Sequence, residues 1–389
     1  MESFLYIIKR EFRMLFYNKA IFIFSVILPI ISILFFNTLL SKGVPRDLPI
    51  AVVDLDNSAL SRNLISQLDA TPELKVNFKP VSQLEGENLI KEGKVYGLVT
   101  IPKNFGSDLK RGKQTKVINQ YNSNILLASG LENKAFRKVV GTLSAGANIQ
   151  KQIAKGTNIN QAKANYQPIT SGNHILSNPY TNYSYYLNSG FLTLFLQIFV
   201  ILTTIYCFGA DLKYSKGEKI YTIAKGNLLV IILAKTLPYT LWFLFIGIVM
   251  LYSMFVFQDF PLFGNKLIIL LSLLLLIIST QAYSLFFIAI SKSFREALTF
   301  GSGFAAVSLS FSGITFPIFG MPKIMQWLSQ IFPFTHFFEL FVDQTQRGIP
   351  IYYSVKSISL LIVLTIVLLA ISYKKLTVLF KQGSFIQRT

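Results

Sequence analysis

The sequence predicts an α-helical integral membrane protein with six transmembrane helices and an inserted extracytoplasmic α/β domain. Ala20–Leu40 is apolar and uncharged, and a bilayer core of about 30 Å needs roughly 20 such residues per helix. Residues 41–187 are of mixed polarity and resemble a water-soluble domain. Residues 188–373 then return to an apolar composition. This order places one helix before the domain and the remaining helices after it.

Five further spans are predicted in this second apolar region, and each is close to the length that crosses a bilayer. They are Ser189–Ala210, Leu228–Phe257, Leu267–Ile290, Leu298–Phe319 and Ser354–Tyr373. Proline and glycine interrupt the chain after the fifth span, and the apolar segments that follow are too short to cross. Residues 317–350 are therefore predicted to form short re-entrant or surface helices.

Basic residues concentrate in alternate loops, although the net charge of +19 could by itself suggest nucleic acid as a partner. The enriched segments contain Lys9, Arg10, Arg13 and Lys19; Lys213, Lys216, Lys219 and Lys225; Lys292 and Arg295; and Lys374, Lys375, Lys381 and Arg388. Cytoplasmic loops carry such an excess of Lys and Arg. We therefore expect residues 1–19 and the tail 374–389 to be cytosolic and residues 41–187 to lie outside. Membrane lipid is the expected partner of these charges, and nucleic acid is not.

The first 19 residues predict a basic amphipathic helix at the cytosolic membrane surface. Its apolar stripe consists of Phe4, Leu5, Ile8, Phe12, Leu15 and Phe16. Lys9, Arg10 and Arg13 lie off this stripe. The alternative is a plain cytosolic extension of the first span.

The external domain alternates strand and helix patterns, which favours a small mixed sheet covered by helices. The predicted strands are Pro49–Leu55, Leu74–Phe78 and Val95–Ile101, with a further segment at Val117–Tyr121. The predicted helices are Ser58–Leu68, capped by Asn57 or Ser58, then Val81–Lys91, begun at Ser82, and a helix within Ile125–Ala154. Residues 155–186 are rich in Asn, Ser, Thr and Tyr, so we expect a loop that returns to the membrane.

Side chains that would support catalysis are sparse. His174 and His336 are far apart in sequence, and Cys207 is the single cysteine, so no catalytic or metal site is predicted. The segment Gly106–Lys113 does not have the spacing of a phosphate-binding loop. We expect no cofactor in this chain, and any energy from a nucleotide would come from another protein.

Several motifs together resemble a known family of membrane proteins. They are Ile50–Ser61, Tyr96-Gly97 with Ile101–Phe105 and Gly112, Lys235–Tyr239, Ser312–Pro317 with Met321-Pro322, and Phe332–Thr335. In this order, over nearly the whole chain, they resemble the permease subunits of type-2 ABC exporters that carry a large external domain. The resemblance implies a non-enzymatic transport subunit of the bacterial inner membrane, which pairs with an identical or homologous permease. A separate ATPase dimer would bind ATP and Mg²⁺; a periplasmic adaptor is left open.

The resemblance also implies where the ATPase makes contact. The amphipathic helix and the loop between the second and third spans serve this role in the family, which points to Arg10 and Arg13, and to Lys216, Gly217 and Glu218. The loop departs from the family pattern, because no threonine follows Gly217 and no proline precedes Asn227. This departure would fit one member of a pair of unlike permeases.

We expect the transport pathway between the second and fifth spans of two protomers. The polar residues predicted to line it are Thr193, Gln197, Thr204, Ser308 and Ser312. The alternative is that the hydroxyl groups bond back to their own helices. The 14% aromatic content favours an amphiphilic or hydrophobic cargo.

Two other functions are compatible with a membrane protein of this organisation. One is a mechanically coupled ABC component that acts on a periplasmic partner; in the family such components have four helices per chain, and six are predicted here. The other is a sensor whose external domain binds a ligand. A sensor needs a cytosolic output domain, and the predicted cytosolic segments are short. Both are therefore secondary to an exporter.

The charge distribution predicts that residues 41–187 and residues 211–226 lie on opposite sides of the membrane. Cysteines introduced as Ser66→Cys and Ser215→Cys, in a Cys207→Ser background, should react with an impermeant maleimide from opposite sides. Labelling of whole cells and of inverted vesicles measures this. Reaction of both cysteines from the same side would contradict the topology.

Overall fold

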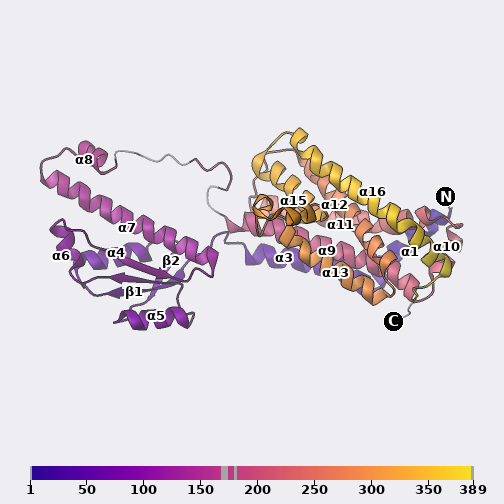
Figure 1. The fold of residues 1–389 in the computed structure, drawn as a ribbon, viewed down its shortest axis with the longest axis horizontal. Helices are drawn as coiled ribbons and strands as arrows, with labels where there is room; N and C mark the ends of the chain where they lie inside the picture. Colours follow the sequence, from indigo (N-terminus) through magenta and orange to yellow (C-terminus); the bar gives the residue numbers. More distant parts are fainter. Residues whose placement is uncertain (1, 168–173, 179–181, 387–389) are drawn as a thin grey trace. The chain divides into compact units, whose positions relative to one another are not determined.

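The computed structural model describes residues 2–167, 174–178 and 182–386 and divides into two compact units (Figure 1). The helical unit comprises Met1–Gly43 and Ile175–Thr389, and the α/β unit comprises Val44–His174. The α/β unit therefore contains fewer residues than the predicted domain 41–187. The predicted boundary at residue 187 falls inside a long helix that begins at Tyr183. Parts of the predicted loop and tail at 168–173, 179–181 and 387–389 lie outside the described residues.

Five helical segments of the helical unit are long and apolar enough to cross a membrane: Lys19–Leu39, α9 (Tyr183–Lys213), α11 (Leu228–Phe257), α12 (Lys266–Ile290) and α16 (Ile351–Gln382). The first segment consists of α2 (Lys19–Phe22), a π-helical turn (Ile23–Ile27) and α3 (Leu28–Leu39). The other elements are α1 (Glu2–Tyr17), α10 (Gly217–Ile223), α13 (Phe294–Phe311), α14 (Lys323–Ser329) and α15 (Pro333–Val342), with a 3₁₀ turn at Ile318–Gly320 and a π-helical turn at Asp343–Arg347. The chain is thus mostly helical, as predicted for an α-helical membrane protein.

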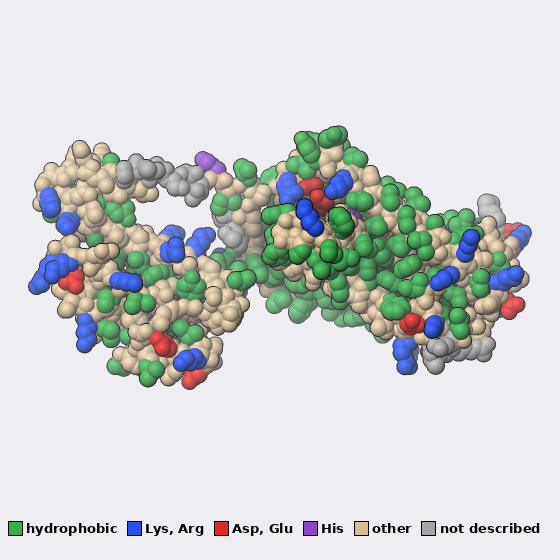
Figure 2. Space-filling view, viewed as in Figure 1, with side chains coloured by type: hydrophobic (Ala, Val, Ile, Leu, Met, Phe, Trp, Pro, Cys, Tyr) green, Lys and Arg blue, Asp and Glu red, His purple; other side chains and the backbone are tan. Residues whose placement is uncertain are grey.

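The α9 helix occupies the centre of this unit. It packs against α12 and α13, and most residues of its apolar stretch are buried. The apolar stretches of α16 and of the first segment are largely exposed. Their exposed side chains are predominantly apolar, and apolar side chains cover much of the visible surface of this unit (Figure 2). Exposed apolar helices of this length suit contact with lipid.

The ends of two predicted spans differ most from the structure. The fifth predicted span ends early, because α13 stops at Phe311 and Gly313 then adopts a φ of +87°, a conformation that ends helices. The α13 helix has 18 residues and is not among the five described segments that are long and apolar enough to cross a membrane. The sixth span therefore stays a prediction. The last helix continues past the predicted end at Tyr373 to Gln382 and is terminated by Gly383 at a φ of +79°.

The α/β unit contains a four-stranded sheet in the order β2-β1-β3-β4. Its strands are β1 (Leu48–Asp54), β2 (Leu74–Phe78), β3 (Gly97–Ile101) and β4 (Ile118–Tyr121). β1 pairs in parallel with β2 and β3, and β4 pairs antiparallel with β3. The helices are α4 (Ala59–Asp69), α5 (Gln83–Lys91), α6 (Phe105–Lys110), α7 (Leu126–Ala154) and α8 (Ile159–Tyr166).

Local signals explain most of these elements. The Ser58 hydroxyl caps α4 by accepting a hydrogen bond from the Ser61 amide at 3.1 Å, so Ser58 rather than Asn57 is the cap. Ser82 caps α5 in the same way. The loop prediction at 155–186 is wrong where α8 forms, with the Asn158 side chain at its N-terminus.

Helices cover both faces of the sheet. Alternate strand residues point to opposite faces, so Ile50 and Val52 face α4, α6 and α7, whereas Ala51 and Val53 face α5. Figure 1 shows the same layers, with α4, α6 and α7 on one side of the strands and α5 on the other.

A carboxyl group is buried between α7 and the sheet. Glu132 is fully buried, and its Oε2 accepts a hydrogen bond from Asn119 Nδ2 on β4 at 3.2 Å. Its Oε1 has no hydrogen-bond partner among the described residues. Gly97 makes room for it, because a Cβ there would lie 2.7 Å from Oε1. Burial raises the pKa of Glu132 from 4.5 to about 7, and the Asn119 contact opposes this only in part.

The raised pKa of Glu132 predicts that the α/β unit becomes less stable as the pH rises. Its folded state holds the proton more tightly than the unfolded state, so the stabilisation is complete below the usual pKa of 4.5 and is lost as the pH approaches about 7. Hydrogen exchange in the full chain, corrected for intrinsic rates, should show weaker protection of α7 and β4 at about pH 7.5 than at about pH 5.

The variant Glu132→Gln should remove most of this pH dependence, because an amide does not titrate. The control Glu92→Gln changes an exposed carboxyl group on the same unit and should leave it intact. An unchanged profile in Glu132→Gln would show that another group titrates.

Candidate functional site: a buried ion cluster

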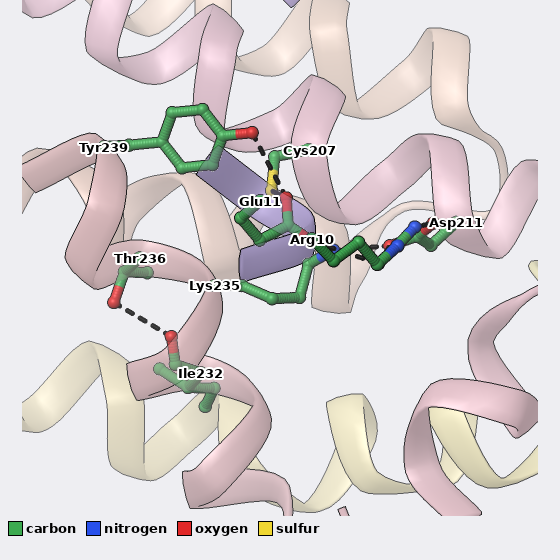
Figure 3. Close-up of polar contacts among 8 residues, drawn as sticks. All are labelled: Arg10, Glu11, Cys207, Asp211, Ile232, Lys235, Thr236 and Tyr239. Atoms are coloured by element: carbon green, nitrogen blue, oxygen red, sulfur yellow. Dashed lines mark hydrogen bonds and ion pairs between the residues drawn. The ribbon is translucent and has the colours of Figure 1, made fainter. Parts of the chain in front are cut away.

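Four charged side chains from three helices meet inside the helical unit (Figure 3). Arg10 and Glu11 come from α1, Asp211 from the last turn of α9, and Lys235 from α11. We refer to these four residues as the ion cluster. Arg10 and Glu11 are neighbours in the chain, but Asp211 and Lys235 are far from them in sequence, so tertiary packing brings the three helices together.

The ion cluster is connected by alternating charges. Arg10 Nη1 lies 3.0 Å from both Glu11 Oε1 and Asp211 Oδ2, and Arg10 Nη2 donates to Asp211 Oδ1, which makes the Arg10–Asp211 pair bidentate. Lys235 Nζ lies 3.0 Å from Glu11 Oε1 and also donates to Asp211 Oδ2. Each carboxylate therefore accepts from both cations, a geometry that strengthens charge-assisted bonds.

Neutral groups complete the coordination of Glu11. Its Oε2 accepts hydrogen bonds from Tyr239 OH and Cys207 Sγ, each at 3.1 Å. Lys235 Nζ also lies 5.1 Å from the centre of the Phe208 ring, within the range of a cation–π contact. Because the cations occupy the acidic groups, nothing here resembles a metal site, and the described residues contain no group of three His, Cys, Asp or Glu side chains suited to one.

The burial of the ion cluster decides its energetic role. The Lys235 and Glu11 side chains are 0% and 1% exposed, and Arg10, at 24%, is the most exposed member. Burial lowers the pKa of Arg10, but its bonds to Asp211 and its attraction to Glu11 raise the pKa by a larger amount. The net effect is a raised pKa, so Arg10 remains charged. The two cations balance the two anions. Removal of any one would leave an uncompensated charge in a nonpolar interior, at a cost of about 3–5 kcal/mol.

The ion cluster fixes which face of α1 is buried. Its buried residues are Ile7, Glu11 and Leu15, at a spacing of four, whereas Leu5 and Phe12 of the predicted apolar stripe are exposed. The sequence contained a signal for this, since Glu11 lies between two apolar residues at helical spacing. Lys235 does not reach the surface of the helical unit, because its side chain is fully buried and paired with Glu11 and Asp211.

The structure disperses the residues predicted to contact an ATPase. Arg10 belongs to the ion cluster, while Arg13 is exposed on α1. Lys216 and Glu218 are exposed at the start of α10, and Gly217 is buried against Gly383 at the end of α16, its amide 3.3 Å from the Gly383 oxygen. A Cβ on Gly217 would lie 3.0 Å from that oxygen, so any larger residue would force the two segments slightly apart. The contact roles of these residues stay predictions.

The residues predicted to line a pathway all lie inside the protomer. Thr193, Gln197, Thr204, Ser308 and Ser312 are each at most 3% exposed. Thr193, Ser308 and Ser312 donate to backbone oxygens of their own helices, as the alternative interpretation expects. Gln197 and Thr204 have side-chain atoms with no hydrogen-bond partner in the described part of the chain. The role of all five residues in a pathway stays a prediction.

Comparison with known proteins defines the class to which this fold belongs. Residues 19–374 match the family described as ABC-2 family transporter protein, and the chain belongs to that family. It is 24% identical over 366 residues to ABC transporter G family member 20 of Dictyostelium discoideum, covering 92% of this chain and 48% of that protein. It is 23% identical over 350 residues to the linearmycin resistance permease protein LnrN of Bacillus subtilis, covering 86% of this chain and 88% of that protein.

The chain spans about half the length of the first of these relatives and most of the second. The family and the apolar helices make the protein a membrane-spanning permease of the ABC transporter class. The predicted resemblance to type-2 ABC permeases is confirmed.

The burial of Lys235 predicts a large loss of stability in Lys235→Met, about 3–5 kcal/mol, because Glu11 and Asp211 would share Arg10 alone. Thermal unfolding of the purified chain, followed by size-exclusion chromatography, should show a midpoint several degrees lower. The matched control Lys219→Met removes an exposed lysine on α10 and should leave the midpoint unchanged.

The double variant Glu11→Gln, Lys235→Met should lose less stability than the sum of the single variants, because it removes one charge of each sign. Strictly additive losses would show that the two charges do not interact.

Proposed function

We propose that this chain is the permease subunit of an ATP-driven exporter and that the ion cluster transmits movement from the ATPase to the membrane helices. The supporting observation is the fixed connection of α1 to α9 and α11 through the ion cluster. A displacement of α1 must either carry these two helices along or break buried ion pairs. Because breaking them is costly, the helices are expected to move together.

The segment that follows α9, which contains α10, is a second place where an ATPase could push on the helical unit. α10 follows α9 directly and packs on the end of α16 through Gly217 and the buried Ile220. An ATPase that pushes on the exposed side of α10, where Glu218 lies, would therefore act on α9 and α16. We propose that α1 and α10 form the two parts of the coupling surface, with Arg13, Lys216 and Glu218 exposed to the ATPase.

Alternating access then follows from rigid movement of helices against a partner permease, identical or homologous. We propose a bacterial inner-membrane location, with both ends of the chain in the cytoplasm and the α/β unit outside, on the evidence of the basic-residue bias. Export is supported by the relative named as a resistance permease, since removal of a compound from the cell gives resistance. The aromatic content favours an amphiphilic or hydrophobic cargo.

This function predicts different defects for two single substitutions in the complex of this chain with its ATPase. Glu218→Lys should weaken co-purification of the ATPase, because it reverses a charge on the exposed contact surface. Arg10→Gln should leave association intact and lower ATP turnover in liposomes about tenfold, the effect of losing about 1.4 kcal/mol of coupling.

Glu92→Lys is the control, since it makes the same charge change at an exposed position on the α/β unit. The permease purified alone should hydrolyse no ATP. Full turnover in Arg10→Gln with transport retained would reject the ion cluster as the transmitting element. ATP hydrolysis by the permease alone would reject the proposed division of labour.

A further inference from the structure

The second half of α7 overhangs two adjoining cavities in the α/β unit. The first half of α7 is packed on the sheet through Leu131, Ala135 and Val139, whereas the described residues of α7 after Val139 include none that is fully buried. One cavity, of about 360 Å³, lies between this half and the segment that leads from α6 to β4. The other, of about 760 Å³, lies between it and α4. We refer to both together as the α7 groove.

The two cavities are continuous along α7, because Leu109, Leu143, Ala147 and Lys151 line both. The floor of the groove is apolar. Leu64 and Phe105, which are 0% and 3% exposed, belong to the core of the unit, and Leu109 and Leu143 pack against that core. A ligand with an apolar portion would thus lie against the partly exposed Leu109 and Leu143, which pack on the hydrophobic core.

The rim of the groove is basic. Lys113 and Lys151 line the smaller cavity, and Lys110, Lys151 and Lys155 line the larger one. No Asp or Glu occurs among the described residues that line either cavity, so the positive charge is uncompensated there. Lys151 Nζ lies 3.4 Å from the Gly112 oxygen, a long hydrogen bond that leaves its other donors available.

The helix that covers the groove has small side chains where the space is largest. Gly146 and Ala147 line the larger cavity, and a Cβ on Gly146 would meet no described atom within 4 Å. Residues 142–155 extend about 20 Å along the groove at the rise of an α-helix. Both volumes fall within the range of about 300–1,000 Å³ that is typical of small-molecule sites.

We propose that the α7 groove binds a single-chain amphiphile with an anionic headgroup, its apolar chain on the floor and its headgroup among the lysines. The charge of the rim selects the sign of the headgroup, and the length of about 20 Å along the groove suits one extended chain. This site is separate from the ion cluster, and the inference does not depend on the proposed export function.

The test uses the full chain in nanodiscs of zwitterionic phosphatidylcholine and a palmitic acid probe that carries a photoreactive diazirine in its chain. After irradiation, mass spectrometry should locate crosslinks on peptides of α6 and the second half of α7. The variant Lys113→Gln, Lys151→Gln should raise the half-saturating probe concentration about tenfold, the effect of losing one charge-assisted contact. Lys134→Gln, Lys138→Gln removes two exposed charges from the first half of α7 and should have no effect.

A steric variant separates occupation of the groove from unfolding. Gly146→Phe should fill the larger cavity and abolish crosslinking there. Gly141→Phe is its matched control, because Gly141 lies on the same helix, has the same free space and lines neither cavity. Equal crosslinking in the two glycine variants would overturn the proposal.

The headgroup and the source of the ligand are tested with two further probes. A trimethylammonium probe of the same chain length should crosslink the groove weakly, and labelling equal to that of the carboxylate would overturn the anionic selectivity. Phosphatidylglycerol added to the nanodisc should not suppress the crosslinks. Suppression would assign the groove to a bilayer phospholipid and overturn the single-chain ligand.

Discussion

The need to neutralise charges in a nonpolar interior governs how the helical unit is assembled. Lys235 lies in a helix long and apolar enough to cross a membrane, yet it is fully buried and paired with Glu11 and Asp211. An isolated ammonium group would be very costly in this position. The α1 helix must therefore be in place for α11 to be stable, and α9 must end where Asp211 can complete the cluster. The folding of the helical unit and the proposed transmission of movement thus depend on the same contacts.

This requirement also distinguishes the ion cluster from an ordinary stabilising contact. Buried ion pairs contribute little net stability compared with apolar packing, but their disruption is expensive. They therefore favour a fixed geometry among three helices more than a high unfolding free energy. A fixed geometry is what transmission of movement from an ATPase requires, because a compliant α1 would move without its neighbours. The contacts of Tyr239 and Cys207 with Glu11 hold the carboxylate in this geometry.

The α/β unit follows a different constraint. Its sheet is covered on both faces, and its core includes α7 only as far as Val139. The second half of the same helix lies over the α7 groove, with small residues where a core helix would carry large ones. A helix packed tightly for half its length and open for the other half is suited to hold a ligand against the core without disturbing the sheet.

Periodicity and local signals in the sequence determined much of the architecture. The strand at Leu74–Phe78, the cap at Ser82 and the apolar runs of α9, α11 and α12 depend on nearest neighbours, and the structure contains each of them. Residues with two possible partners required the tertiary structure. Glu11 could have been a solvated charge, and Lys235 could have extended to the surface. Only the packing of helices distant in sequence decides these cases, because the partner of a buried charge is set by which side chains meet in space.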